Sequence, residues 1–433
     1  MAFSRRNFLQ RAGIAGLAAA APLQALYARS AAGQSIEGAG FGPLVPDPQG
    51  VLDLPKGFRY TVFSQVGETM SDGTPVPANH DGMAAFAGPG GTTILVRNHE
   101  LSPLVYNPVE APEDKKYDSL CKGGTTTLVV SADRRLLNHY VSLAGTYWNC
   151  AGGPTPWGSW ISCEETVATP ARNELVSVAH GYAFEVPILA KGPVDPVPLK
   201  AMGRFTHEAA VVDPKTGIVY MTEDMDTGLF YRFVPKQPGQ LRAGGTLEAL
   251  RIPSMPKAFT GKDFPLNRPM AVDWVTIEDF DPVDDTVRVE GFDKGAAIFA
   301  GGEGACFARG EVFFSASDGG SAELGQIWRY TPGRNAGEGG TIELFVEPND
   351  DALLDGPDNI VLAPFGDLFV CEDGDGTQFV RGITPEGKLY SFARNALNGF
   401  EFTGASFSPD GKTFFVNIQI PGMTFAIWGP WSR

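Results

Sequence analysis

The sequence predicts an all-β fold, a six-bladed β-propeller with irregular insertions, and three observations support it. Gly and Pro, at 53 and 34 of 433 residues, are frequent without a collagen period, which is typical of tight turns between short strands. Apolar runs separate these turns along the chain. Six times, an acid or amide is followed 14 to 17 residues later by a second polar cluster, with a turn and an apolar strand between them. The ends of a propeller's innermost strands converge on one mouth of the central channel, so this repeat predicts a ring of polar residues.

The six repeats are unequal in length and start 43 to 95 residues apart. Their polar ends are Asp81 and Asn98, Asn149 and Cys163, Glu208 and Glu223, Glu303 and Ser317, Asp358 and Glu372, and Glu401 and Asn417. Two β-sandwiches in tandem are the alternative, but nothing resembling a linker divides the chain. We therefore expect a single propeller domain over residues 33–433.

The expected elements follow this repeat in chain order. A Gly- and Pro-rich arm over residues 33–55 leads into the first strand and closes the architecture. Apolar or alternating runs between turn signals predict strands at 58–63, 92–96, 125–130, 138–143, 181–186, 204–212, 218–222, 229–234, 312–314, 326–330, 367–370 and 415–419. Residues 240–295 are less regular, and we expect an excursion or lid there.

The N-terminal segment resembles a twin-arginine export signal. Arg5 and Arg6 lie in the motif at residues 4–9, and an apolar run rich in Ala and Gly follows over residues 12–26. We expect residues 1–32 to be a signal peptide that engages the twin-arginine export machinery and delivers the mature chain to the periplasm or outside the cell. A short membrane anchor is the alternative. No stretch of 18 or more apolar residues follows, so we expect no stable membrane insertion of the mature chain.

Charge and cysteine usage exclude several classes of protein. The net charge of −16 makes nucleic acid an unsuitable partner, because phosphate backbones require a basic face. The five cysteines are odd in number and contain no CxxC pair, so neither a disulfide framework nor a zinc ribbon is indicated. Cys306 and Cys371 lie in apolar strands, where packing is the expected role.

The run that ends in Cys163, Glu164 and Glu165 delivers a thiol beside two carboxylates. Carboxylate oxygens suit Ca²⁺, and a thiolate among them suits iron. Acids at other strand ends are candidates for the same metal cluster, since packing them together is costly without cations. The candidate ligands are Cys163, Glu164, Glu208, Glu303, Asp358, Glu372 and Asp373. A buried thiol at Cys163 and turn roles for the last three acids are the alternatives.

Several stretches together resemble the PhoX-type alkaline phosphatase family. They are residues 157–165, 205–208, 356–360 with 371–373, and 407–411 with 429–431. The run at 162–165 combined with 419–425 is the more specific part of the likeness. The resemblance implies a propeller exported by the twin-arginine route, with Fe³⁺ and Ca²⁺ at the channel mouth, that hydrolyses small phosphorylated substrates for phosphate acquisition.

The resemblance also implies roles for particular residues. Cys163 and Glu208 correspond to iron ligands, Glu303 to a further metal-binding glutamate, and Asn98 to an asparagine beside the substrate phosphate. Asn98 and Glu208 are therefore the predicted catalytic residues. One departure is Gly301, which stands where the family pattern has an arginine. Without that arginine, the binding free energy for phosphate would be weaker by ~1.5 to 3 kcal/mol, as is typical of a charged hydrogen bond, unless Arg97, Arg204 or Arg381 takes its place.

The expected function is therefore metal-dependent hydrolysis of phosphomonoesters by a monomeric protein outside the cytoplasm. The chain has neither a Gly-x-Ser-x-Gly elbow nor a P-loop, and clustered cations need no side-chain nucleophile. Two alternatives stay open. A calcium-dependent propeller lactonase or esterase would use the same acids without Cys163, and a non-catalytic periplasmic propeller would be consistent with the glycine at position 301.

Overall fold

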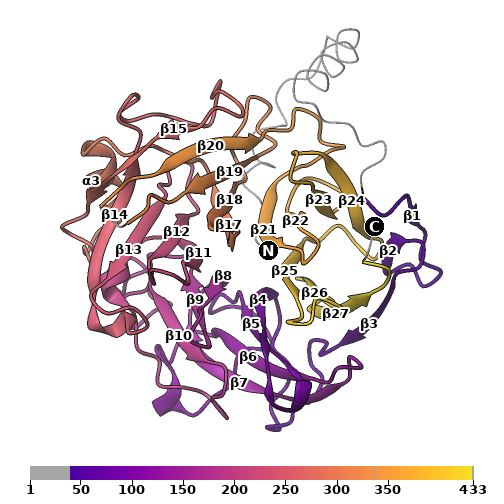
Figure 1. The fold of residues 1–433 in the computed structure, drawn as a ribbon. Helices are drawn as coiled ribbons and strands as arrows, with labels where there is room; N and C mark the ends of the chain where they lie inside the picture. The colour runs from indigo at the N-terminus through magenta and orange to yellow at the C-terminus, as the bar shows by residue number, and fades with distance from the viewer. Residues whose placement is uncertain (1–39, 336, 432–433) are drawn as a thin grey trace, which may run out of the picture.

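The computed structural model of the chain describes residues 40–335 and 337–431. Six antiparallel sheets are arranged around a central axis, as Figure 1 shows. This arrangement confirms the predicted all-β, six-bladed propeller. We number the blades 1 to 6 in chain order from the sheet that begins with β4.

Each blade is a short antiparallel meander that starts at the central axis. The innermost strands, each in contact with those of both neighbouring blades, are β4 (His80–Ala87), β8 (Asn149–Pro154), β11 (His207–Val212), β17 (Gly302–Ala308), β21 (Pro357–Leu362) and β25 (Phe402–Phe407). The second strands are β5 (Thr93–His99), β9 (Ser159–Glu164), β12 (Val219–Glu223), β18 (Glu311–Ala316), β22 (Leu368–Glu372) and β26 (Phe414–Ile418). The outer strands are β6 (Gly123–Val130), β7 (Leu136–Thr146), β10 (Ala183–Pro187), β13 (Tyr231–Pro235), β14 (Gly245–Arg251), β19 (Gln326–Thr331), β20 (Thr341–Val346), β23 (Phe379–Ile383), β24 (Leu389–Asn395) and β27 (Met423–Trp428).

The N-terminal arm closes the ring of blades. Strand β3 (Arg59–Phe63) pairs with β27, so the last blade is completed by a strand from the start of the described chain. Strand β2 (Leu52–Pro55) pairs with β24 of blade 5, and β1 (Leu44–Val45) pairs with β2. In Figure 1 these indigo strands lie beside the yellow strands of the C-terminal blades. The predicted closing role of the arm is confirmed, because the arm ties both C-terminal blades to the chain's beginning.

The hydrophobic core fills the spaces between adjacent blades. Ile161 of blade 2 lies in one cluster with Tyr231 of blade 3. Between blades 3 and 4, Phe230 and Phe314 stack with ring centroids 4.3 Å apart. Because each sheet buries both faces against its neighbours, its strands are apolar on both sides, and only the strand ends are available for chemistry.

The segment 240–295 differs from the expected lid. Strands β14 and β16 (Asp273–Thr276) extend blade 3, and β15 (Met270–Ala271) adds an outer strand to blade 4. The segment also holds α3 (Val287–Asp293). Short 3-10 turns are η1 (Pro89–Gly91), η2 (Glu113–Lys115), η3 (Lys200–Met202) and η4 (Leu241–Ala243). Much of the irregular stretch therefore builds the outer edges of two blades.

Two predictions concern the N-terminus and membranes. Residues 1–32, the predicted signal peptide, lie outside the described residues. Within residues 40–335 and 337–431, no helix has the length and apolar character needed to cross a membrane.

Candidate metal centre

Every innermost strand carries a β-bulge close to the central channel. The pairing register shifts between His80 and Met83, Asn149 and Gly152, His207 and Ala210, Gly302 and Ala305, Pro357 and Ile360, and Thr403 and Ser406. A bulge leaves one extra residue unpaired and redirects its side chain. The first bulged residues are Asp81, Cys150, Glu208, Glu303, Asp358 and Gly404. Five of the six blades therefore present a carboxylate or a thiol at the same level of the channel.

A second set of polar residues follows the second strand of each blade. These residues are Glu100, Glu165, Asp224, Ser317, Asp373 and Gln419. Hydrogen bonds join the two sets: the Gln419 amide donates to Asp81 at 3.2 Å and to Glu100 at 2.8 Å. The Ser317 hydroxyl donates to Glu303 at 2.8 Å. The two sets therefore form one cluster at the mouth of the channel, which we call the acidic ring.

Within the acidic ring, two groups of side chains have the spacing of metal ligands. Ligand atoms of Cys150, Glu165 and Glu208 lie within 4.8 Å of one another, and so do those of Glu208, Glu303 and Asp358. The first group combines a thiol with carboxylates, which suits iron, and the second is composed of oxygen donors, which suit calcium. Glu208 belongs to both groups. Its carboxylate can therefore bridge two neighbouring ions.

Electrostatics gives the acidic ring a strong need for cations. Burial and then repulsion between neighbouring carboxylates raise the pKa of these acids. The pKa is raised to about 7 for Glu100 and to about 8 for Asp358, and well above the ordinary value for Asp81, Glu165, Glu208 and Glu303, as it is for the neighbouring Glu401. The neighbours responsible include Asp224 and Asp373. At neutral pH these carboxylates can ionise together only if cations replace their protons.

The thiol of Cys150 is in the same situation. Burial raises its pKa well above the ordinary value, and the nearby Glu208 carboxylate raises it further. The Sγ atom lies 3.3 Å from the carbonyl oxygen of His207. A thiol in this environment becomes a thiolate only when a metal ion takes the place of its proton.

Glu164 and Glu372, two predicted ligands, lie outside the acidic ring. Glu164 Oε1 lies 2.7 Å from His180 Nδ1, and its Oε2 accepts the backbone N–H of Gly181 at 2.9 Å. Glu372 Oε1 accepts the Nε–H of Arg381 at 2.7 Å. Each of these side chains faces a basic side chain, so its oxygens are already engaged in hydrogen bonds within the protein.

Cys163 belongs to neither of the two ligand groups. It is fully buried in a hydrophobic cluster with Ile161 and Phe205. Its position on β9 is opposite the bulge of β8, where the pairing passes from Asn149 to Gly152. A side chain at this position points toward the neighbouring blade and packs as a small apolar group. Cys150, from the strand before it, is the thiol that belongs to a ligand group, while burial and then the Glu208 carboxylate also raise the pKa of Cys163.

Asn98 lies opposite the bulge of β4 in blade 1, as Cys163 lies opposite the bulge of β8. Its side chain forms hydrogen bonds with the bulge of β8 in blade 2. Its amide nitrogen donates to the carbonyl oxygens of Cys150 at 3.0 Å and Ala151 at 2.6 Å. Its carbonyl oxygen accepts from Trp160 and Ser162, each at 2.9 Å. Both amide hydrogens are therefore engaged within the protein, and the side chain fixes the bulge that carries the thiol.

The structure thus brings some predicted residues together and leaves others apart. Glu208, Glu303, Asp358 and Asp373 belong to the acidic ring, whereas Asn98, Cys163, Glu164 and Glu372 do not. Sequence reasoning named Asp81 and Glu401 as polar ends of the repeat but not as metal ligands, and it missed Cys150, Glu165, Glu100 and Asp224 as members of the ring. The signal was present in the repeat, because aligning the six inner strands puts Cys150 in register with Asp81 and Glu208.

The three arginines considered as substitutes for the arginine expected at position 301 are all engaged in hydrogen bonds within the protein. Arg97 donates to Thr424 at 2.6 Å, Arg204 to the carbonyl oxygen of Pro282 at 3.1 Å, and Arg381 to Glu372 at 2.7 Å. Gly301 itself has φ of +62°, and an added Cβ would meet the Ser317 hydroxyl. The backbone here favours glycine, so a side chain at this position is disfavoured on steric grounds.

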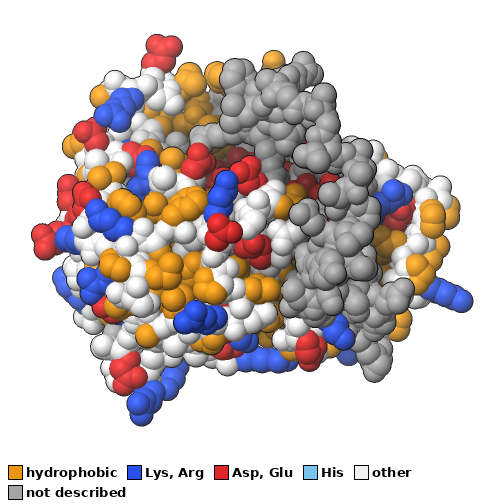
Figure 2. Space-filling model, turned by 90° about the horizontal axis from the view of Figure 1, so that it is seen from above, with side chains coloured by type: hydrophobic (Ala, Val, Ile, Leu, Met, Phe, Trp, Pro, Cys, Tyr) orange, Lys and Arg blue, Asp and Glu red, His pale blue; other side chains and the backbone are white. Residues whose placement is uncertain are grey.

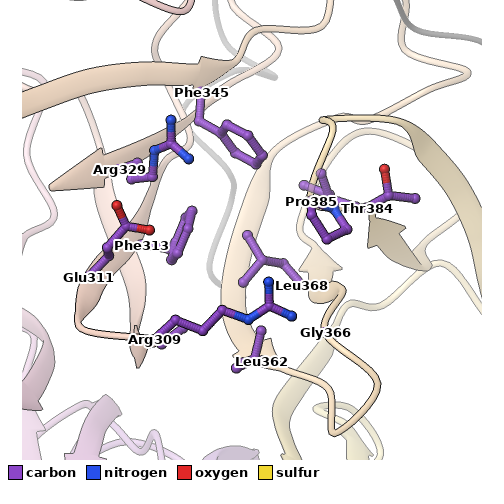
Figure 3. A pocket seen from close by; sticks show the side chains of 12 residues that line it. Arg309, Glu311, Phe313, Arg329, Phe345, Leu362, Gly366, Leu368, Thr384 and Pro385 are labelled. Carbon is purple, nitrogen blue, oxygen red and sulfur yellow. The ribbon is translucent and has the colours of Figure 1, made fainter. Parts of the chain in front are cut away.

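A separate pocket lies between blades 4 and 5, away from the acidic ring. Its lining includes Arg309, Phe313, Arg329 and Phe345 from blade 4 and Leu368 from blade 5, as Figure 3 shows. Strands β17 and β21 begin at the acidic ring and run toward this pocket, which their last residues line. It therefore opens at the opposite end of these blades from the metal centre.

Known proteins resemble the chain in sequence and in fold. The sequence model for the family described as alkaline phosphatase PhoX matches residues 39–422. Among solved structures, Pseudomonas fluorescens PhoX in complex with vanadate, a transition state analogue, aligns with a TM-score of 0.70 and 19% identity over 91% of this chain and 98% of that chain. A gluconolactonase from Xanthomonas campestris aligns with a TM-score of 0.43 and 12% identity over 91% of this chain and 99% of that one. No curated protein sequence matches significantly. The chain belongs to the alkaline phosphatase PhoX family, and its activity is hydrolysis of phosphomonoesters.

Proposed function

We propose that the chain hydrolyses phosphomonoesters outside the cytoplasm with a cluster of iron and calcium ions held by the acidic ring. Iron is assigned to Cys150, Glu165 and Glu208, and calcium to the oxygen donors around Glu208, Glu303 and Asp358. The observation that carries this proposal is the pair of ligand groups that share Glu208. One group has the donor set of a soft or borderline metal and the other that of a hard one.

The residues of the ring fit such a cluster in charge as well as in donor type. The carboxylates with raised pKa values must be either protonated or bound to cations near neutral pH. When bound, several cations would stabilise negative charge on the phosphate oxygens and promote attack by water. The chain's own contribution is to hold Glu208, Glu303 and Asp358 in fixed positions on bulged strands before substrate arrives.

Bulge-fixing side chains supply much of that rigidity. Asn98 holds the carbonyl oxygens of Cys150 and Ala151, and Asn417 donates to the carbonyl oxygen of Asp81 at 2.8 Å. Ser315 donates to the carbonyl oxygen of Asp358 at 2.5 Å. Pre-set ligands cost no reorganisation during the reaction, which is how electrostatic stabilisation becomes effective. We therefore assign to Asn98 a positioning role.

Location, assembly and partners belong to the same proposal. The twin-arginine motif within residues 1–32 favours export through that machinery, with a propeller of residues 33–433 as the mature, monomeric protein. On the side seen in Figure 2, acidic and basic side chains are interspersed, and the net charge is −16. This surface favours small phosphorylated substrates over nucleic acid as the molecules bound.

The test compares two cysteines of the same blade. Iron and calcium are measured by elemental analysis on protein exported through its own signal, together with a visible absorption spectrum and phosphomonoesterase activity. We expect both metals in the wild type and in Cys163→Ala, and loss of the thiolate-to-iron band, iron and activity in Cys150→Ala. Loss of the band in Cys163→Ala alone would contradict the assignment. Calcium without iron, with hydrolysis of lactones or esters, would favour the lactonase alternative.

A further inference from the structure

A second group of metal-ligating side chains lies outside the acidic ring, where blade 1 meets blade 2. Asp118 and Cys121 belong to the turn before β6, and His180 ends the segment 165–180, which we call the strap. Ligand atoms of these three residues lie within 4.8 Å of one another, and all three side chains are buried. Asp118 and His180 have no exposed side-chain surface. The group is therefore shielded from solvent and built from residues distant in sequence.

Two distances, both from His180, are close to edges of a tetrahedral zinc site. His180 Nε2 lies 3.5 Å from Cys121 Sγ and 3.2 Å from Asp118 Oδ2. Zinc with ordinary bond lengths to sulfur, nitrogen and oxygen separates such ligands by ~3.6 Å and ~3.3 Å. A ring nitrogen carries at most one hydrogen, so it cannot donate a separate hydrogen bond to each of the two groups. One metal ion could instead bind all three donors.

The surroundings orient each donor as they do in protein zinc sites. Glu164 Oε1 lies 2.7 Å from His180 Nδ1, so a hydrogen on Nδ1 leaves the lone pair of Nε2 directed at Cys121 and Asp118. The Asp118 carboxylate accepts the backbone N–H groups of Leu120 at 2.9 Å and Ser177 at 2.6 Å. Both outer contacts are of the kind that fixes metal-binding imidazoles and carboxylates.

Comparison with other blades shows why a metal suits this place. Glu223 and Glu372 occupy the same strand position as Glu164, and they face the guanidinium groups of Arg288 and Arg381. Glu164 instead faces an imidazole that has a thiol and a second carboxylate behind it. A divalent ion would supply the positive charge that arginine supplies elsewhere.

We propose that Asp118, Cys121 and His180 bind a structural zinc ion that anchors the strap to blade 1. The strap begins at Glu165, a member of the acidic ring, and Glu165 is bonded through its N–H to the carbonyl oxygen of Trp148 at 2.8 Å. Zinc thereby stabilises the segment next to the metal centre without taking part in the reaction. The ion is distinct from those of the acidic ring in ligands and in burial.

Elemental analysis of the full-length protein purified after growth with zinc tests this proposal. We expect one zinc ion per chain in the wild type and in Cys306→Ala, a matched removal of a thiol elsewhere. We expect none in Cys121→Ala, with iron and calcium retained. In cobalt-loaded protein, the thiolate-to-cobalt band should persist in Cys150→Ala and vanish in Cys121→Ala.

Asp118→Asn keeps the size of the side chain and serves as the second variant if Cys121→Ala does not fold. Loss of an outer contact typically lowers metal affinity by up to ~100-fold. Because Asp118→Asn removes the charge of a direct ligand, it should lower zinc affinity by more than that. Equal zinc content in the wild type and in either folded variant would overturn the proposal. So would a wild type that takes up no zinc from solution, in which case protonated His180 alone is the partner of Glu164.

Discussion

Two rows of acids lie next to each other along the chain and have opposite surroundings. In Glu164–Glu165, Glu223–Asp224 and Glu372–Asp373, the first acid is buried beside a basic side chain and the second belongs to the acidic ring. The basic side chains are His180, Arg288 and Arg381. We call the first acids the paired row. Because successive strand residues point in opposite directions, a shift of one residue separates the paired acids from the acids that we propose bind metal.

The pKa values express the same difference. Burial raises the pKa of Glu372 and Arg381 lowers it, so the net pKa is about 7. For Glu165, burial and then neighbouring carboxylates such as Asp224 all raise the pKa, which lies well above the ordinary value. Paired acids therefore already have their counter-charge within the protein. For Glu165 and Glu303 the neighbouring charges are other carboxylates, so bound cations would supply the counter-charge.

The largest expected effect comes from breaking the acidic ring at its shared member. Glu208→Gln removes a charge from both ligand groups, so we expect loss of iron and calcium and a fall in kcat of more than ~10³-fold, beyond the ~100-fold typical of outer contacts. Elemental analysis and phosphomonoester turnover measure this. Glu223→Gln is the control in the paired row, and it should keep its metals. Retention of both metals in Glu208→Gln would contradict a bridging role.

Breaking the paired row should affect stability rather than metal content. Arg381→Met leaves the Glu372 carboxylate buried without its cation, which typically costs ~3–5 kcal/mol. Urea denaturation of the metal-loaded protein measures the change in the free energy of unfolding. Arg135→Met, which removes an exposed ion pair with Asp133, should change it by less than ~1 kcal/mol. If Arg381→Met folds but loses its metals, Glu372 would instead belong to the metal centre.

Local features of this fold can be predicted from the sequence, whereas features that depend on contacts between distant residues cannot. Turns and apolar strands are local signals, so the six blades and their polar ends are predictable. The bulges are not, because they depend on the pairing between strands. For that reason the sequence points to Cys163, whereas the structure places Cys150 in a ligand group with Glu165 and Glu208. The cation partners are equally hidden, since Arg288 is 65 residues from Glu223.

Removing the metals should reverse the pH dependence of stability. In metal-free protein the raised pKa values of Glu100, about 7, and Asp358, about 8, give stability that is present below the ordinary carboxylate pKa and lost as pH rises through 7 to 8. Bound cations keep the same carboxylates ionised, so the loaded protein should lose stability as pH falls instead. Thermal melting of chelator-treated and loaded protein from about pH 5 to about pH 9 compares the two slopes. Parallel slopes would mean that the acidic ring holds no cations.

The smallest expected effect comes from Asn98, which does not belong to the acidic ring but holds the backbone that carries Cys150. Asn98→Ala removes the two hydrogen bonds that hold the carbonyl oxygens of Cys150 and Ala151, so the bulge of β8 can relax and the thiol loses its fixed position. Outer contacts of this kind change metal affinity or activity by ~10–100-fold. We expect weaker iron binding and lower kcat with little change in KM, because the amide has no free donor for a substrate. Thr125→Ala, which breaks a buried hydroxyl contact with Ser142 in the same blade, serves as the control. A rise in KM with unchanged iron content would instead show that Asn98 contacts the substrate. Its role would then not be to position the bulge of β8.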